Sequence, residues 1–106
     1  MSLPSISVII PTYNRQSYLT EAISSVLNQS YKDLKLIVID DNSTDSTAEL
    51  VALFTDERIQ YIKNKQNLGL VRNWKNAIEI CDTEFLAVLE DDNIYASNHL
   101  EEALRV

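Results

Sequence analysis

Short apolar runs separated by longer mixed segments set the pattern of this chain. Ile6–Ile10, Leu34–Ile39 and Glu84–Leu89 are apolar at most positions, which is typical of parallel strands buried on both faces of a sheet. Arg58–Ile62 instead alternates polar and apolar residues, and this predicts a half-exposed strand at a sheet edge. We therefore expect four strands, the first of them ended by Pro11, which cannot donate to a sheet ladder.

In the segments between these runs, apolar residues recur at the spacing of amphipathic helices. A one-sided stripe extends from Tyr18 to about Asn28. Ser46-Thr47-Ala48-Glu49 has the spacing of a capping box, with Asp45 and Ser46 as alternative N-caps, and predicts a second helix through Phe54.

The only glycine, Gly69, precedes a third predicted helix, whose apolar face is Val71, Trp74, Ala77, Ile78 and Cys81. A last helix is expected to begin near Asn98. Strands that alternate with helices predict an α/β fold with a Rossmann-like parallel sheet and right-handed crossovers. With the alternating third strand at an edge, the simplest strand order is 3-2-1-4.

Composition narrows the class of protein. The chain has 106 residues, 45% of them hydrophobic, and a formal net charge of -7, so it is one folded domain at most and lacks the basic surface that nucleic acid or an anionic membrane requires. No apolar stretch approaches the roughly 18 residues of a membrane span. The single cysteine, Cys81, excludes an internal disulfide, which fits a reducing compartment, and we expect a cytoplasmic protein.

Polar residues follow the first, second and fourth predicted strands, as Pro11–Asn14, Asp40–Asn42 and Glu90–Asp92. The carboxyl ends of parallel strands share one rim, where ligands bind. Crowded carboxylates there favour a hard divalent cation such as Mg²⁺ or Mn²⁺, which in turn holds phosphates. Since the chain has no glycine-rich phosphate loop, a metal would have to bind the phosphates of a nucleotide.

Taken together, five segments in order resemble the successive motifs of the family 2 inverting glycosyltransferases of GT-A fold. They are Ser7–Arg15, Gln29–Tyr31, Ile39–Asp45, Asn67–Gly69 and Leu89–Asp92. The segment Asp91–Tyr95 is similar to that of the spore-coat polysaccharide members. The resemblance implies that residues 1–106 are the N-terminal, nucleotide-diphospho-sugar-binding half of such an enzyme, with a UDP-sugar as donor and inversion at the anomeric carbon.

The resemblance also implies site residues. The residues that the resemblance implies for nucleotide binding are Pro11, Thr12, Tyr13, Asn14, Arg15, Asp41, Asn67, Gly69 and Asp91. In the family, the carboxylate at the position of Asp41 borders the nucleobase, together with the loop of Tyr13. Asp92 ligates the metal, Mn²⁺ or Mg²⁺, and Asp91 is the second residue of the metal site, which lies towards the ribose and phosphates.

Two departures from the family pattern matter. Glu90 stands where many members have aspartate, although Asp92 stays in register. The second half of the family is absent, so the catalytic base and the acceptor pocket are expected beyond Val106, and the chain is expected to bind UDP-type nucleotides without transferring sugar. If the fourth strand is central in the complete enzyme, its exposed apolar edge predicts a homodimer.

Three other functions stay open. A phosphoacceptor signalling domain is also a small acidic α/β unit that binds magnesium, but its paired acids should follow the first strand, which here ends in Pro11-Thr12-Tyr13. A nucleotidyltransferase should have a glycine-rich basic loop there. A non-catalytic interaction fragment would bind neither nucleotide nor metal.

Overall fold

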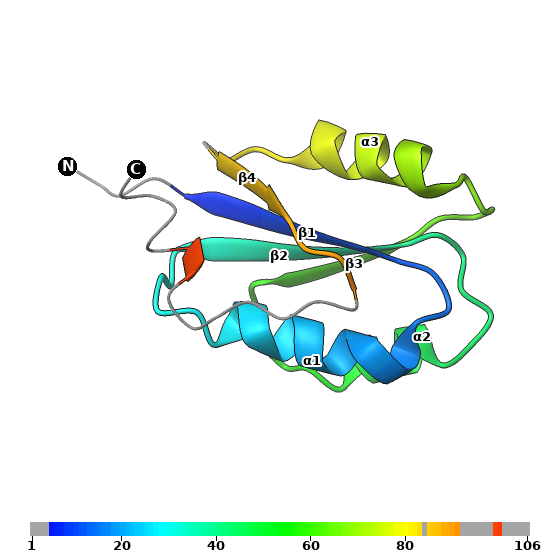
Figure 1. The fold of residues 1–106 in the computed structure, drawn as a ribbon, viewed down its shortest axis with the longest axis horizontal. Helices are drawn as coiled ribbons and strands as arrows, with labels where there is room; N and C mark the ends of the chain where they lie inside the picture. The colour runs from blue at the N-terminus through cyan, green and yellow to red at the C-terminus, as the bar shows by residue number, and fades with distance from the viewer. Residues whose placement is uncertain (1–4, 84, 92–98, 101–106) are drawn as a thin grey trace.

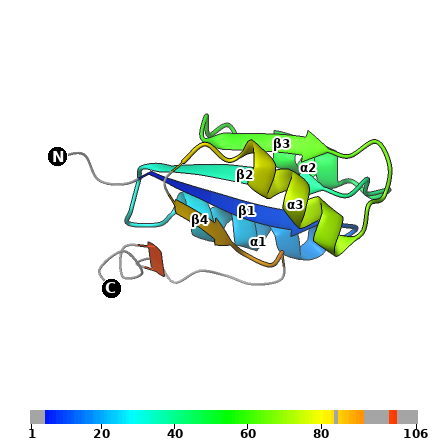
Figure 2. The same cartoon turned by 90° about the horizontal axis from the view of Figure 1, so that it is seen from above.

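The chain folds into a parallel sheet between two helical layers (Figures 1 and 2). The structure, a computed structural model, describes residues 5–83, 85–91 and 99–100. Its four strands run in the order β3-β2-β1-β4, which confirms the predicted order. They are β1 (Ile6–Thr12), β2 (Leu34–Asp40), β3 (Ile59–Lys63) and β4 (Phe85–Val88). One face is covered by α1 (Gln16–Leu27) and α2 (Thr47–Ala52), and the other by α3 (Leu70–Ile80).

Alternation along the central strands divides the core into two layers. Side chains at even positions of β1 and β2 pack towards α1 and α2, and they include Val8, Ile10, Leu36 and Val38. Side chains at odd positions face α3, where Ile9, Ile37 and Ile39 pack with Ala77. Because both faces are covered, the strands are apolar at almost every position, as the sequence pattern indicated.

Pro11 does not end β1, contrary to the prediction. It pairs in register with Ile39, and the strand continues to Thr12. The carbonyl of Ile9 accepts a hydrogen bond from Leu89 at 2.9 Å, so Ile9 and, two residues on, Pro11 turn their backbone polar groups towards β4. Since β4 ends at Val88, the missing N–H of Pro11 falls where this side of β1 has no partner strand among the residues that the structure describes.

The predicted capping box of α2 is not formed. Ser46 is the N-cap but makes no side-chain hydrogen bond to the helix. Asp45 caps instead, since its Oδ1 accepts a hydrogen bond from the backbone N–H of Thr47 at 3.1 Å. Burial raises the pKa of Asp45, but the hydrogen bonds from Thr47, Gln16 and its own backbone together outweigh it and hold the pKa below its usual value. The helix also ends at Ala52, before the predicted end at Phe54.

Helix α3 packs on the sheet through part of the predicted face, Ala77 and Cys81, but not through the rest of it. Its buried residues are Asn73 and Ala77, whereas Val71 is 66% and Ile78 46% exposed. The amide of Asn73 fixes this orientation by donating to the carbonyl of Ile39 at 3.1 Å. A polar residue therefore shares the buried face with Ala77, and apolar periodicity alone did not predict its place there.

Few residues are described beyond Asp91. His99 and Leu100 are helical, in agreement with a helix beginning near Asn98, and the rest of that predicted helix lies outside the described residues. Among the described helices, none has the length and apolar character needed to cross a membrane.

Asp40, at the end of β2, organises the loops on the α1 side of the sheet. Its buried carboxylate accepts hydrogen bonds from the N–H of Ser43 at 2.9 Å, from the hydroxyl of Ser43 at 2.6 Å and from the hydroxyl of Tyr61. The oxygen of Ser43 in turn accepts the N–H of Asn14 at 2.9 Å. Burial and the bond to Asp40 raise the pKa of Tyr61. An unbroken chain of hydrogen bonds thus links edge strand β3 to the residue after Tyr13.

Removing the hydroxyl of Tyr61 should destabilise the fold. Tyr61→Phe leaves the buried carboxylate of Asp40 short of one donor, and we expect the free energy of unfolding to fall by about 1–3 kcal/mol. Urea denaturation measures this change. Tyr18→Phe is the matched control, because the Tyr18 side chain is 54% exposed. Equal stability of the two variants would show that the hydrogen bond contributes nothing.

Candidate functional site

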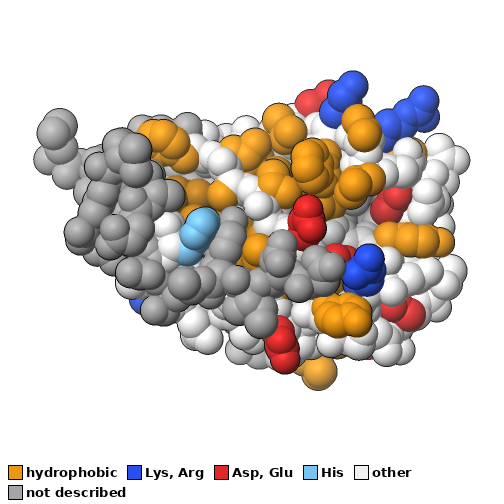
Figure 3. Space-filling model, viewed as in Figure 1, with side chains coloured by type: hydrophobic (Ala, Val, Ile, Leu, Met, Phe, Trp, Pro, Cys, Tyr) orange, Lys and Arg blue, Asp and Glu red, His pale blue; other side chains and the backbone are white. Residues whose placement is uncertain are grey.

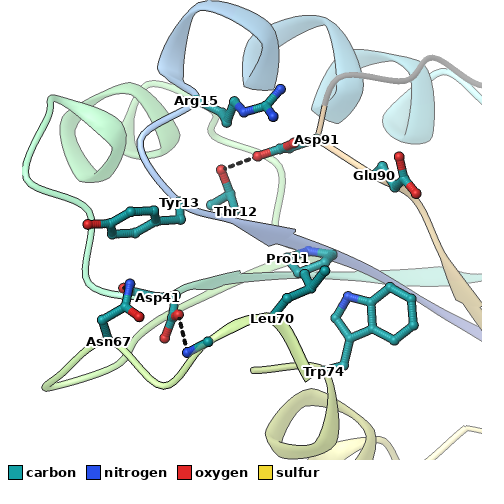
Figure 4. A pocket seen from close by; sticks show the side chains of 11 residues that line it. Pro11, Thr12, Tyr13, Arg15, Asp41, Asn67, Leu70, Trp74, Glu90 and Asp91 are labelled. Carbon is teal, nitrogen blue, oxygen red and sulfur yellow. Dashed lines mark hydrogen bonds between the residues drawn. The ribbon is translucent and has the colours of Figure 1, made fainter. Parts of the chain in front are cut away.

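A pocket of about 510 Å³ opens at the carboxyl ends of the strands (Figure 4). Its walls come from the end of β1 and the loop after it, the end of β2, the loop before α3, the first turns of α3 and the residues after β4. The lining residues are Pro11, Thr12, Tyr13, Arg15, Asp41, Asn67, Gly69, Leu70, Trp74, Glu90 and Asp91. The volume lies in the range of small-molecule sites.

The fold brings together nearly all of the residues predicted to bind a nucleotide. Each of them lines the pocket except Asn14. The side chain of Asn14 turns to the loop after β2, where its Oδ1 accepts the N–H of Thr44 at 2.8 Å. Asn14 has a φ of 52°, a conformation that asparagine adopts more readily than most residues. Its place is therefore to shape the loop that carries Tyr13, which is 46% exposed in the pocket.

Asp41 holds the loop on the α3 side of the pocket. Its Oδ1 accepts the N–H of Leu68 at 2.7 Å and the amide of Asn64 at 3.0 Å, and its Oδ2 accepts the N–H of Gly69 at 2.8 Å. Asn67 adds a bond from its side-chain amide to the backbone carbonyl of Asp41 at 3.3 Å. Asp41 as a whole residue is only 4% exposed. These donors therefore compensate the cost of burying its carboxylate.

Gly69 is required by backbone geometry. Its φ is 85°, and it occupies the N-cap position of α3. Side chains other than glycine are strained in this region, which agrees with the prediction of a helix entry that needs glycine. The N–H of Gly69 bonds to Asp41, and the first turn of α3 therefore starts at the pocket wall.

Charged groups of both signs line the side of the pocket towards α1. Thr12 donates its hydroxyl hydrogen to Oδ2 of Asp91 at 2.9 Å, which joins the end of β1 to the residues after β4 (Figure 4). Arg15 lines the same side, with its guanidinium carbon 5.8 Å from the ring centre of Tyr18. The combination of one cation and one oriented carboxylate suits a ligand that carries both hydroxyl and phosphate groups.

Glu90 lines the pocket as a member of the predicted rim cluster Glu90–Asp92, whereas two lining residues, Leu70 and Trp74, were missed by the sequence analysis. Trp74 was expected in the core, and that expectation was wrong, because it lies one helical turn after Leu70 on the part of α3 that faces the pocket. The available signal was the position of both residues directly after the glycine loop, four apart and thus on one helix face.

The predicted metal ligands are described only in part. Asp92 lies outside the described residues, and within them no group of three or more histidine, cysteine, aspartate or glutamate side chains is placed to hold a metal ion. Asp91 lines the pocket beside Arg15. A single oriented carboxylate is compatible with Mg²⁺ or Mn²⁺, since these ions take one or two protein carboxylates and complete their coordination with phosphates and water.

Comparison with known proteins finds relatives of similar sequence and similar structure. A beta-1,3-glucosyltransferase of Campylobacter jejuni that acts on GalNAc(5)-diNAcBac-PP-undecaprenol is 42% identical over 101 residues, which cover 92% of this chain and 33% of that protein. TarS of S. aureus in complex with UDP-GlcNAc superposes with a TM-score of 0.89 at 27% identity, covering 95% of this chain and 30% of TarS. The chain thus spans about a third of the length of these relatives.

The fold recurs in a more distant structure. The mannosyltransferase PcManGT of Pyrobaculum calidifontis, in complex with GDP-Man and Mn²⁺, has a TM-score of 0.90 at 24% identity, with 96% of this chain and 32% of PcManGT covered. This likeness places the sheet and helices in the GT-A, Rossmann-like arrangement that the strand order already indicated. Residues 7–106 also match the sequence model of Glycosyl transferase family 2, and the chain therefore belongs to that family.

Proposed function

We propose that the pocket binds a nucleotide-diphospho-sugar, with UDP-sugars as the favoured class. The observation that carries the proposal is the meeting of an exposed aromatic ring, a buried acceptor carboxylate and a cation in one pocket, contributed by Tyr13, Asp41 and Arg15. Residues 1–106 are then the nucleotide-sugar-binding part of an inverting glycosyltransferase. The catalytic base and the acceptor site belong to the part that the relatives have in addition.

The nucleobase lies between Tyr13 and Asp41. Base stacking on an aromatic ring is favourable for any base, so Tyr13 contributes affinity and little selectivity. Selectivity comes from Asp41, because a carboxylate has about four acceptor positions and three are used by Asn64, Leu68 and Gly69. The remaining position accepts the imide N–H of uracil.

The diphosphate lies towards Arg15 and Asp91. Departure of a nucleoside diphosphate develops negative charge on its oxygens, and a divalent ion stabilises this charge. Asp91 and Asp92 would hold that ion, Mn²⁺ or Mg²⁺. The bond from Thr12 orients the carboxylate of Asp91, and PcManGT, a relative in fold, was crystallised with Mn²⁺. Arg15 supplies a fixed positive charge on the same side.

A cytoplasmic location stays a prediction. Cys81 is a free thiol that donates to the carbonyl of Ala77 at 3.2 Å, which suits a reducing compartment.

Metal-dependent binding of UDP tests the proposal. Titration calorimetry of the chain with UDP and Mn²⁺ should give saturable heat. Asp92→Asn should weaken the binding of UDP at least about tenfold, because the loss of a residue in or next to a metal's ligand set typically lowers metal affinity by this factor. Asp82→Asn is the matched control. It also removes one negative charge, but Asp82 pairs with Lys35 at the start of β2, at the opposite end of the sheet.

Two results would contradict this function. No heat with UDP, or heat that Asp92→Asn leaves unchanged, favours the non-catalytic interaction fragment. Phosphorylation of the chain by acetyl phosphate favours the phosphoacceptor domain, since the transferase predicts none.

Selectivity for the base is a separate expectation. CDP presents an acceptor nitrogen where UDP presents the imide N–H, so the carboxylate of Asp41 faces a lone pair. We expect CDP to bind at least about tenfold more weakly than UDP in the same titration, which corresponds to roughly 1.4 kcal/mol. Equal affinity for the two nucleotides would remove Asp41 from base recognition.

Self-association is expected through β4. Its outer edge has no partner strand among the described residues, and Phe85 and Leu86 are 49% and 40% exposed. Hydrophobic side chains gather over β4 and α3 in Figure 3. A second copy that pairs along this edge would satisfy its backbone groups.

Light scattering at increasing concentration measures this association. Leu86→Lys should shift the chain to monomer, because it places a charge on the pairing edge. Leu53→Lys is the control, since Leu53 is 80% exposed just after α2, on the other side of the sheet. A monodisperse monomer at high concentration would contradict the homodimer.

A further inference from the structure

Hydrogen bonds tie the start of α1 to the loop after β2. The N–H of Gln16 donates to Oδ2 of Asp45 at 3.4 Å, and Oε1 of Gln16 accepts the N–H of Ser46 at 2.5 Å. Asn14, two residues earlier, bonds to the same loop through its N–H and its Oδ1. Two segments that are 29 or 30 residues apart in the sequence are thus joined on both sides of Arg15.

The bonds of Gln16 replace a cap on α1. Arg15 is the N-cap residue of this helix and makes no side-chain hydrogen bond to it, although the first N–H groups of a helix need acceptors. Asp45 supplies an acceptor to Gln16 and at the same time caps α2 through Thr47. Its negative charge lies at the start of both helices, where the helix dipoles favour it. One carboxylate therefore joins α1 to α2, which pack on the same face of the sheet (Figure 1).

Little apolar burial holds the stretch from Tyr13 to Tyr18. Every residue in it is exposed, whereas all of β1 before it is buried. Segments with few buried contacts open locally at a low cost in free energy. The position of this stretch therefore depends on its hydrogen bonds to the loop after β2.

Arg15 is the pocket residue that lies between these bonds. Its guanidinium is on the same side of the pocket as Asp91 (Figure 4), whereas the side chain of Gln16, the next residue, turns to Ser46. An arginine side chain has many rotamers, and fixing its backbone before a ligand arrives lowers the entropy cost of binding. Gln16 is thus placed to act on the ligand through Arg15.

We propose that Gln16 is a positioning residue, which by its bonds to Asp45 and Ser46 fixes Arg15 at the pocket and so strengthens the binding of a diphosphate group. The inference rests on the proposed function, in which the diphosphate lies towards Arg15. It adds a residue outside the pocket lining to those that determine affinity.

Gln16 should act on the phosphates and spare the nucleoside. Tyr13 is held separately, by the chain of hydrogen bonds from Asn14 to the buried carboxylate of Asp40. Loss of the Gln16 bonds therefore loosens Arg15 and leaves the base side of the pocket in place. UDP and uridine, which differ by the diphosphate, separate these two effects.

Gln16→Met tests the inference. Methionine keeps the length of the side chain and the net charge but lacks the amide oxygen that accepts from Ser46. We expect UDP, titrated with Mn²⁺ by calorimetry, to bind about fivefold more weakly, which is the usual effect of one lost hydrogen bond. Uridine, titrated by NMR chemical shifts, should bind the variant and the unsubstituted chain equally. The midpoint of urea denaturation should not change, because Gln16 is exposed.

A matched control and a second background complete the experiment. Gln60→Met makes the same change at an exposed residue of β3 and should leave the binding of both ligands unaffected. Arg15→Gln removes the cation, and in that background Gln16→Met should have no further effect on UDP, because substitutions that act through one another are not additive.

The other results overturn the inference. If Gln16→Met leaves the binding of UDP unchanged, or weakens UDP and uridine equally, Gln16 does not act through the phosphates, although the proposed function stands. The same holds if Gln16→Met weakens UDP just as much after Arg15→Gln. If the unsubstituted chain binds no UDP, the proposed function fails and this inference fails with it.

Discussion

Two consecutive carboxylates at the end of β2 determine the shape of the pocket. Because side chains alternate along a strand, Asp40 continues the row of Leu36 and Val38 towards α1, and Asp41 follows Ile37 and Ile39 towards α3. Each carboxylate is buried, and each must therefore collect hydrogen-bond donors from the loops on its own side. One dipeptide thus fixes two separate walls.

The two walls differ in whether their buried carboxylate lines the pocket. On the α1 side, Asp40 acts only through Ser43 and Asn14, so it sets the position of Tyr13 without reaching a ligand. On the α3 side, Asp41 lines the pocket itself while it binds the backbone of Leu68 and Gly69. A carboxylate already held by three donors does not move when a ligand arrives, and recognition by a preorganised acceptor loses little conformational entropy.

The sequence was sufficient for the sheet because burial on both faces leaves an unambiguous record. Continuous apolar runs identified the buried strands β1 and β2, and the alternation of Arg58–Ile62 identified an edge, which together gave the order 3-2-1-4. The third apolar run became β4, but the prediction that it is buried on both faces was wrong, because β4 is largely exposed. The apolar pattern also failed where a polar side chain decides the packing. Asn73 bonds to Ile39 and Asn64 and so takes a place beside Ala77 on the buried side of α3, while Val71 and Ile78 of the predicted face are exposed. The position of Trp74 at the pocket was missed because the apolar pattern did not show this arrangement.

The charge of the chain bears on how the pocket would bind the anionic ligand proposed for it. A net charge of -7 repels free nucleotides at long range, but screening at physiological ionic strength confines this repulsion to about 8 Å. Within that distance the carboxylates of Glu90 and Asp91 remain unfavourable for a bare diphosphate, and Arg15 is the only cationic residue among the described residues that line the pocket. A nucleotide that carries its own divalent ion would bring positive charge to these acids. A polynucleotide would find no basic surface here to bind its phosphates. Under the proposed function, the acidity that disfavours nucleic acid would also favour a metal-bound nucleotide over a bare one.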